Sequence, residues 1–157
     1  MEIFKKIATS KDPATLEEVL GKISRVGEIF AQVHSRNVTL GDTKPDNVLI
    51  KQDGTIFLID FEQSTKEEKG DTAWDIAVFL YYSGHYLQPF SRSTKAEAVT
   101  KAFIKGYLKG GGKADDIREA GDPKYTRVFS VFTQPPMMRV ISDVCKKTKD
   151  PEGKVLG

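Results

Sequence analysis

Apolar residues are spaced along the chain in a pattern that predicts a mostly helical protein. Between Leu16 and Val33 they recur every three or four positions, which is the period of one buried helix face. The dipeptide Asp12-Pro13 and a capping box that begins at Thr15 precede this run and favour a helix start. We therefore expect a long amphipathic helix that ends near His34.

Two short apolar runs in the middle of the chain predict a pair of strands. Residues 48–50 and 56–59 consist mainly of Val, Ile and Leu, and Gln52-Asp53-Gly54 lies between them. Because Gly54 tolerates a positive φ, this connection is typical of a β-hairpin turn. The two runs should pair as a small antiparallel hairpin.

Helical patterns dominate the rest of the chain. Residues 72–84 are apolar nearly all round, which predicts a buried central helix. A capping box at 94–97 begins another helix, which should stop at the glycines of 110–112. Shorter helices are expected at 114–120 and 137–147, and residues 125–132 could form helix or strand. The predicted class is α+β, mostly helical, in one domain that covers residues 1–157.

Composition and charge exclude several classes of protein. Apolar residues make up 39% of the chain and charged residues 29%, which is typical of a soluble globular protein. The net charge of +2 is too small to indicate a nucleic-acid or membrane partner. One cysteine cannot form an internal disulfide, and neither a membrane-spanning run nor a signal peptide is found. We expect a cytoplasmic protein.

Side chains with possible chemistry lie on both sides of the hairpin. Asp42, Lys44 and Asn47 precede its first strand, and Asp60 follows its second. Since a tight hairpin brings its two ends together, these residues should converge. Phosphoryl transfer requires a carboxylate to orient the attacking hydroxyl, oxygen ligands for Mg²⁺ and a cation near the transferred group. The segment could supply all of them.

The motif Asp-x-Lys-Pro-x-Asn at 42–47, followed by a hairpin and by Ile-Asp-Phe at 59–61, resembles the catalytic loop and metal motif of protein-kinase-like enzymes. The resemblance implies a kinase C-terminal lobe with its catalytic loop at 40–50, its metal motif at 60–62 and ATP as co-substrate. It also implies a role for each residue. These roles are catalytic base for Asp42, γ-phosphate contact for Lys44, ligands of Mg²⁺ or Mn²⁺ for Asn47 and Asp60, and a brace of the catalytic loop for Asp75.

Two features of the motif point to different relatives. Gly41 before the base is similar to RIO kinases, aminoglycoside phosphotransferases and the small archaeal kinase of the tRNA-modification complex. Lys44, two residues after the base, is instead the choice of Ser/Thr protein kinases. The resemblance thus favours an atypical Ser/Thr protein kinase with a protein substrate. A small-molecule kinase or ATPase of the same superfamily, and a pseudokinase-type protein-binding module, remain as alternatives.

Other residues near the motif have plainer interpretations. Glu62 replaces the usual glycine of the metal motif, and it is either a third acid beside the metal or an exposed residue. His34 is expected to be a satisfied histidine at a helix end, and His85 to belong to an aromatic cluster.

Residues that would cover ATP are not found ahead of the first long helix. Neither a Gly-rich phosphate loop nor a lysine-bearing strand fits into Met1–Thr9. We therefore expect the N-terminal lobe to be absent, either because the chain is a dissected C-terminal lobe, which we favour, or because it works with a partner chain. Alone, it should transfer phosphate very weakly or not at all.

Overall fold

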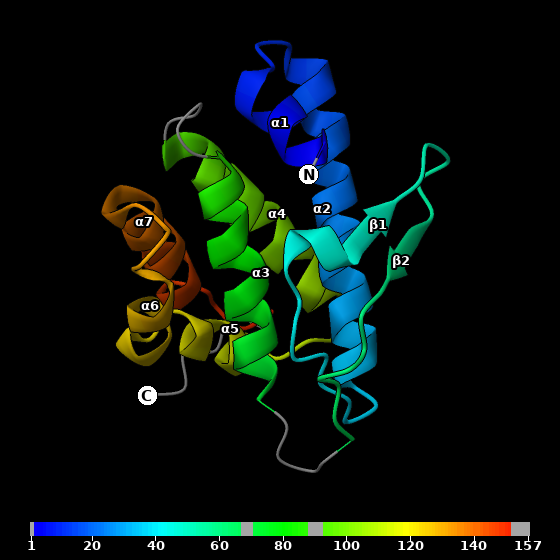
Figure 1. Cartoon of the computed structure of the whole chain (residues 1–157), viewed down its shortest axis with the longest axis vertical. Coiled ribbons are helices and arrows are strands. Elements are labelled where there is room, and N and C mark those ends of the chain that lie inside the picture. The colour runs from blue at the N-terminus through cyan, green and yellow to red at the C-terminus, as the bar shows by residue number, and fades with distance from the viewer. Residues whose placement is uncertain (1, 67–70, 88–92, 152–157) are drawn as a thin grey trace.

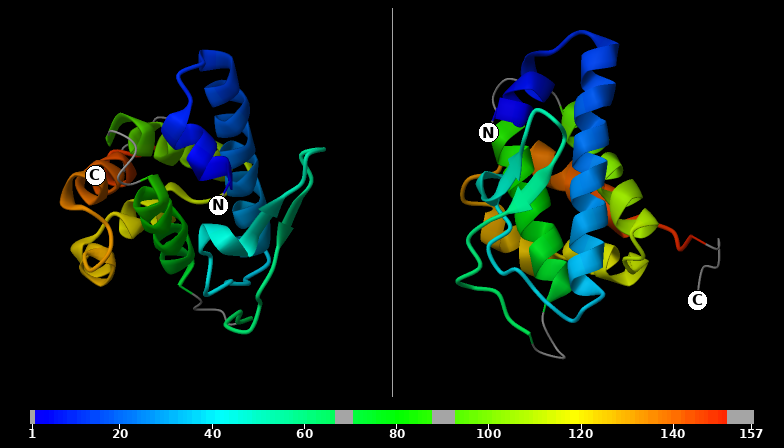
Figure 2. Two further views of the ribbon diagram at one scale, coloured as in Figure 1. Left: turned by 45° about the horizontal axis from the view of Figure 1, so that its top comes forward. Right: turned by 90° about the vertical axis from the view of Figure 1, so that its right-hand side faces the viewer.

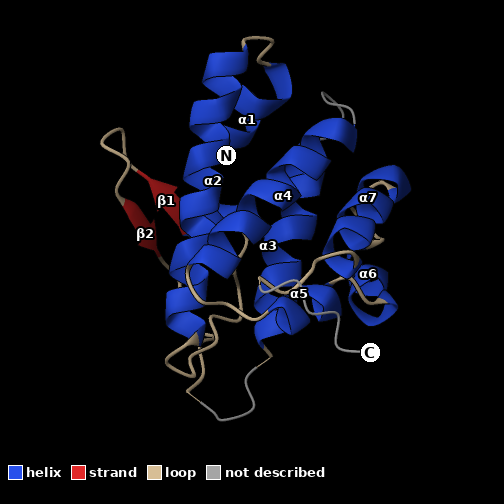
Figure 3. Ribbon diagram, turned by 180° about the vertical axis from the view of Figure 1, so that it is seen from behind, coloured by secondary structure: helices blue, strands red, loops and turns tan. Residues whose placement is uncertain are grey.

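The computed structural model describes residues 2–66, 71–87 and 93–151. In this part of the chain the fold is mostly helical, as predicted, with a single small sheet at one edge of the helical body (Figure 3). The elements are α1 (Glu2–Thr9), α2 (Pro13–His34), the 3-10 turn η1 (Pro45–Asn47), β1 (Val48–Ile50), β2 (Ile56–Leu58), α3 (Thr72–Leu87), α4 (Ser93–Lys109), α5 (Ala114–Ala120), α6 (Pro123–Phe129) and α7 (Pro135–Lys146).

Some helix boundaries differ from the predicted ones, and proline explains where two of the helices begin. Helix α2 begins at Pro13, and its N-cap is Asp12, whose carboxylate accepts from the Thr15 N–H at 3.0 Å. Proline suits the first helical position because its missing N–H would be unpaired there, and α7 likewise starts at Pro135, two residues before the predicted start. The ambiguous segment 125–132 is helical up to Phe129, where α6 ends, and its last three residues form a turn.

Helix α3 occupies the centre of the molecule (Figure 1). It packs against α1, α4, α5, α6 and α7. Ile76, Phe79, Leu80 and Tyr81 are each 1% exposed or less, so the all-round apolar pattern of this helix is explained by burial on every side. The prediction of a buried central helix is confirmed, although the helix continues to Leu87.

Helices α2 and α4 approach each other backbone to backbone. A Cβ atom added at Gly27 would collide with the carbonyl of Phe103, and one added at Gly106 would collide with the carbonyl of Ser24. These two glycines are therefore required by the contact between the helices, which is one of the main contacts of the fold.

The hairpin β1–β2 lies against one side of the helical body (Figure 2). Its register pairs Val48 with Leu58, Leu49 with Phe57 and Ile50 with Ile56. Because strand side chains alternate between faces, the first and last pairs pack against the core, whereas Leu49 and Phe57 are 48% and 44% exposed. The strands are thus buried on one face only.

In the described ranges, none of the helices is long and apolar enough to cross a membrane.

Candidate functional site

The first turn of α3 fixes the loop that precedes the hairpin. The buried Asp75 carboxylate accepts the backbone N–H groups of Leu40 and Gly41, both at 2.7 Å. The Thr43 hydroxyl donates to the Asp75 carbonyl at 2.6 Å, and the Trp74 indole donates to the Gly41 carbonyl at 2.9 Å. Because these contacts are buried or partly buried, they hold the loop rigidly. The geometry matches the bracing contact that the resemblance implied for Asp75.

The backbone conformation explains why the residue before Asp42 is a glycine. Gly41 has a φ of 82°, which L side chains rarely adopt, and an added Cβ would lie 2.6 Å from the backbone oxygen of Gln63. In the motif, Gly41 indicates only which subfamily the chain resembles. In the structure it allows the chain to turn toward Asp42 while passing close to Gln63.

Asp42 and Lys44 form an ion pair beside this turn. The Lys44 ammonium lies 3.1 Å from Asp42 Oδ2 and 5.5 Å from the centre of the Tyr82 ring. The hydrogen bond to Asp42 raises the pKa of Lys44, and the negative charges of Asp42 and Asp60 add to this effect against the opposing effect of burial. Lys44 is therefore a cation at neutral pH. Its charge is positioned near both carboxylates.

Asp42, Asn47 and Asp60 line a single small pocket, with Leu40, Val48 and Leu58 among its apolar walls. The hairpin causes this convergence, because Asn47 precedes β1, Asp60 follows β2, and the N–H of Ile59 donates to the Asn47 carbonyl at 3.0 Å. The predicted meeting of residues from both ends of the hairpin is thus present in the structure.

The free oxygens of this pocket fit a metal ion that arrives with a nucleotide. Asn47 Nδ2 donates to the Asp42 carbonyl at 2.9 Å, which leaves the amide oxygen available, and the Asp60 carboxylate is exposed. Among the described residues, no group of three or more His, Cys, Asp or Glu side chains could hold a metal alone. Mg²⁺ in nucleotide sites commonly takes one or two protein carboxylates and completes its shell with phosphates and water. Asn47 and Asp60 suit that arrangement, in which the ion would neutralise phosphate charge.

A buried polar chain lies behind the loop. His34 Nε2 is 2.9 Å from Asp75 Oδ2, and His34 Nδ1 is 2.9 Å from the Tyr107 hydroxyl. The Tyr107 hydroxyl also donates to Asp116 at 3.2 Å. Both ring nitrogens of His34 therefore have partners, so the structure agrees with a satisfied histidine at the end of α2.

The remaining residues singled out by the sequence lie at the margin of the site. His85 Nδ1 is 2.8 Å from the Phe132 carbonyl, and its ring packs beside those of Tyr86 and Phe132, as the predicted cluster requires. Glu62 is exposed. Its two interpretations remain predictions.

Sequence reasoning missed the aromatic residues that support the loop. Trp74 anchors Gly41, Tyr82 lies under the Lys44 ammonium, and the Tyr86 hydroxyl donates to Asp46 at 2.6 Å. The available signal was their position on α3, since Tyr82 and Tyr86 follow Asp75 by about two and three helical turns. That spacing places Asp75, Tyr82 and Tyr86 on one side of the helix.

Known proteins resemble parts of this chain. Residues 5–107 match the family described as "Lipopolysaccharide kinase (Kdo/WaaP) family". Two sets of forms of the cGMP-dependent protein kinase, isozyme 2, of Drosophila melanogaster are each 39% identical to it over 49 residues. These matches cover 31% of this chain but only 5% and 4% of the relatives. No solved structure matches.

The family match spans 103 of the 157 residues and includes the loop, the hairpin and most of the helices that hold them. The two fly enzymes are similar to the chain over a shorter stretch. The chain therefore belongs to the lipopolysaccharide kinase (Kdo/WaaP) family.

Proposed function

We propose that this chain is the catalytic lobe of an ATP- and Mg²⁺-dependent phosphotransferase that transfers the γ-phosphoryl group to a sugar hydroxyl. The observation that carries the proposal is the pocket shared by Asp42, Asn47 and Asp60, with Lys44 paired to Asp42 beside it. Catalysis of phosphoryl transfer is mostly positioning and electrostatic stabilisation. A rigid loop with this set of charges supports that chemistry.

Each residue has a role in the proposed reaction. Asp42 orients the acceptor hydroxyl and takes its proton, and Lys44 neutralises charge on the transferred phosphoryl group. Asn47 and Asp60 would hold the metal ion, which would neutralise charge on the ATP phosphates. A protein that served only as a binding module would have no physical need for this full set, so we disfavour the pseudokinase alternative.

An apolar surface beside the pocket supports nucleotide binding. Leu49, Phe57, Ile59 and Phe61 are all large, apolar and between 41% and 54% exposed, and two of them, Ile59 and Phe61, also line the pocket. Such a surface suits the adenine ring and the element that covers it. We propose that a kinase N-terminal lobe, or a partner chain, packs on this surface.

The family description favours a sugar over a protein as acceptor. It names lipopolysaccharide kinases, and this agrees better with the small-molecule alternative than with the Ser/Thr protein kinase that Lys44 suggested. The short connection from Asp60 to α3, which begins at Thr72, also offers little chain on which a peptide could lie. Because ATP is the proposed donor, we place the reaction in the cytoplasm.

Phosphorylation of Ser or Thr in a protein is the second candidate. Lys44 lies two residues after Asp42, the spacing of Ser/Thr protein kinases, and is paired with it at 3.1 Å. The two fly relatives are protein kinases by name. These observations cover a smaller part of the chain than the family match does.

Transfer of radiolabel from ATP tests the proposal. The chain, alone and joined to the N-terminal lobe of a Kdo/WaaP relative, is given Mg²⁺, ATP and either a Kdo-containing lipopolysaccharide core or a generic protein acceptor. We expect the joined form to label the sugar, and Asp42→Asn to reduce turnover by roughly 10²- to 10⁴-fold, the usual contribution of a positioned base. Nucleotide affinity should stay the same.

The assay also separates the candidates. Labelling of the protein but not of the sugar would support the second candidate. Failure of the joined form to bind ATP in the presence of Mg²⁺ would contradict both.

A further inference from the structure

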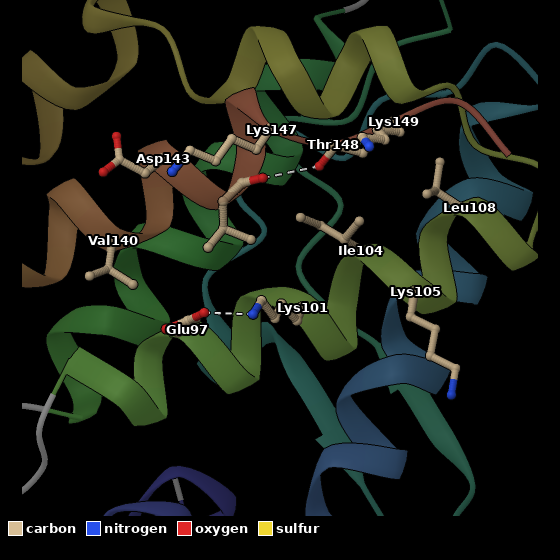
Figure 4. A pocket seen from close by; sticks show the side chains of 11 residues that line it. Glu97, Lys101, Ile104, Lys105, Leu108, Val140, Asp143, Lys147, Thr148 and Lys149 are labelled. Carbon is tan, nitrogen blue, oxygen red and sulfur yellow. Dashed lines mark hydrogen bonds and ion pairs between the residues drawn. The ribbon is translucent and has the colours of Figure 1, made fainter. Parts of the chain in front are cut away.

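A second concave surface lies between α4 and α7 (Figure 4). Its lining shares no residue with the pocket around Asp60. The apolar part of the lining is entirely aliphatic and comes from two helices, with Ile104 and Leu108 on α4 and Val140 and Val144 on α7. Its volume is about 530 Å³.

Lysines surround this groove. Lys101 and Lys105 come from α4, and Lys147 and Lys149 follow the end of α7. These four lysines face only two acidic side chains, Glu97 and Asp143, so the lining carries a net charge of +2.

One of these lysines already has a charged partner. Lys101 pairs with Glu97 at 2.6 Å, and in Figure 4 this pair lies at the same end as Val140. Within the described ranges, Lys105, Lys147 and Lys149 form no ion pair. A surplus of positive charge thus remains around the aliphatic floor.

The segment that carries Lys149 is held in place. The Arg118 guanidinium donates to the Thr148 carbonyl at 2.9 Å and to the Asp150 carboxylate at 3.3 Å. The Thr148 hydroxyl donates back to the Val144 carbonyl at 3.2 Å. Anchoring of the residues on both sides of Lys149 reduces the ordering that a ligand would have to impose.

Size and lining limit what the groove can hold. Small-molecule sites usually measure about 300–1,000 Å³, and the groove, at about 530 Å³, falls within this range. The lining contains no aromatic ring on which a base could stack. The aliphatic floor therefore suits a ligand with an aliphatic chain. The surplus lysines suit an anionic group at one end of that chain.

We propose that this groove binds a single-chain lipid phosphate, a phosphate monoester of an aliphatic alcohol. A phosphate monoester carries about −1.5 to −2 charges at pH 7, which complements the net charge of the lining. The alkyl chain lies on Ile104, Leu108, Val140 and Val144, and the phosphate lies between Lys105 and Lys149, on the Leu108 side of the groove (Figure 4). The proposal does not depend on phosphotransferase activity.

Methyl NMR spectra of the folded chain test this proposal. Octyl phosphate, below the concentration at which it forms micelles, should shift the methyl signals of Ile104, Leu108, Val140 and Val144. Inorganic phosphate and the neutral octyl glucoside should each bind at least tenfold more weakly. In a series of alkyl phosphates, each added methylene should tighten binding by up to roughly fourfold until the floor is covered.

Paired lysine variants locate the phosphate. Lys105→Gln combined with Lys149→Gln should weaken octyl phosphate binding by roughly 20- to 30-fold, since a lysine near an anionic lipid group contributes about a fivefold factor. The control combines Lys113→Gln with Lys146→Gln, which removes the same charge from exposed positions outside the groove. The control should bind as the unchanged chain does.

Several results would overturn the proposal. These are equal binding of octyl glucoside, equal loss of affinity in the control variant, and ligand shifts at Leu49 and Ile59 in place of the groove. Tighter binding of a Glu-rich peptide at the same methyl groups would assign the groove to a protein partner. Concentration-dependent shifts of these methyls without ligand would assign it to a second copy of the chain.

Discussion

Asp60 is held in a backbone conformation that does not suit its side chain. Its φ is 64°, and the only other described non-glycine residue with a positive φ is Asn37, in the turn after α2. Left-handed backbone costs free energy for residues with a Cβ, although less for Asp and Asn. At Asn37 the left-handed conformation belongs to an ordinary turn. At Asp60 the same conformation places a carboxylate on the pocket wall.

Asp60→Gly should therefore separate stability from metal binding. Glycine adopts a positive φ freely, so the free energy of unfolding should rise by about 0.5–1 kcal/mol, while Mg²⁺-dependent ATP binding is lost with the carboxylate. Thermal unfolding and a Mg²⁺ titration at fixed nucleotide measure the two effects. Asn37→Gly is the control, because it should stabilise the fold without changing ATP binding. An unchanged Mg²⁺ midpoint in the Asp60 variant would remove this residue from the metal site.

Asp75 should contribute to stability and activity together. Its carboxylate is the partner of two loop N–H groups and of His34, and removing a buried charged acceptor leaves these donors unpaired. Asp75→Ala should lower the free energy of unfolding by roughly 2–4 kcal/mol. Asp116→Ala, which removes only the outer partner of Tyr107, should cost at most about 1 kcal/mol. Equal unfolding midpoints for both variants would contradict the bracing role.

At the scale of elements, the contact between α2 and α4 depends on residues that are poor helix formers. Glycine inside a helix is less favourable than alanine by about 0.8–1 kcal/mol. The close approach of the two backbones explains why Gly27 and Gly106 are nevertheless present. Gly21, in the same helix α2, has no such reason, because a Cβ atom added there would meet no other atom within 4 Å.

Substitution by alanine should change the stability of the protein in opposite directions at Gly106 and Gly21. Gly106→Ala should destabilise the protein by about 1–3 kcal/mol, because forcing a side chain into a packed contact outweighs the gain in helix propensity. Gly21→Ala should stabilise it by about 0.5–1 kcal/mol, because only the propensity changes there. Chemical denaturation of the two variants measures both values. A stabilising Gly106→Ala would show that the helices pack less closely than described.

Local patterns allowed the elements to be predicted, but not all of their contacts. The period of α2, the Asp53-Gly54 turn and the all-round apolar α3 each depend on neighbouring residues, which the sequence displays directly. The convergence of Asn47 and Asp60 could also be predicted, since one hairpin joins them. The placement of Lys44 over Tyr82 could not, because their distance depends on how the loop packs on α3.

At the scale of the whole molecule, two surfaces of different chemistry lie on separate parts of the fold. The acidic pocket and its exposed apolar neighbours lie where the loop, the hairpin and α2 meet. The lysine-lined groove is formed by α4, α7 and the segment that follows α7. The sequence contains no motif that predicts this groove, because Ile104 and Val144 are brought together only by helix packing. A probe of the pocket should therefore leave the groove unaffected, which supplies an internal reference.

The measurement that tests the central claim most directly is paramagnetic broadening of amide signals by Mn²⁺-ATP, which replaces Mg²⁺-ATP and needs no acceptor. Mn²⁺ bound with the nucleotide should broaden the amides of residues 42–44, 46–47 and 58–61 first and leave Ile104 and Val144 sharp. In Asp60→Ala this selective broadening should disappear while the fold is retained. Broadening centred elsewhere, or unchanged in the Asp60 variant, would contradict the assignment of the pocket as the metal and phosphate site.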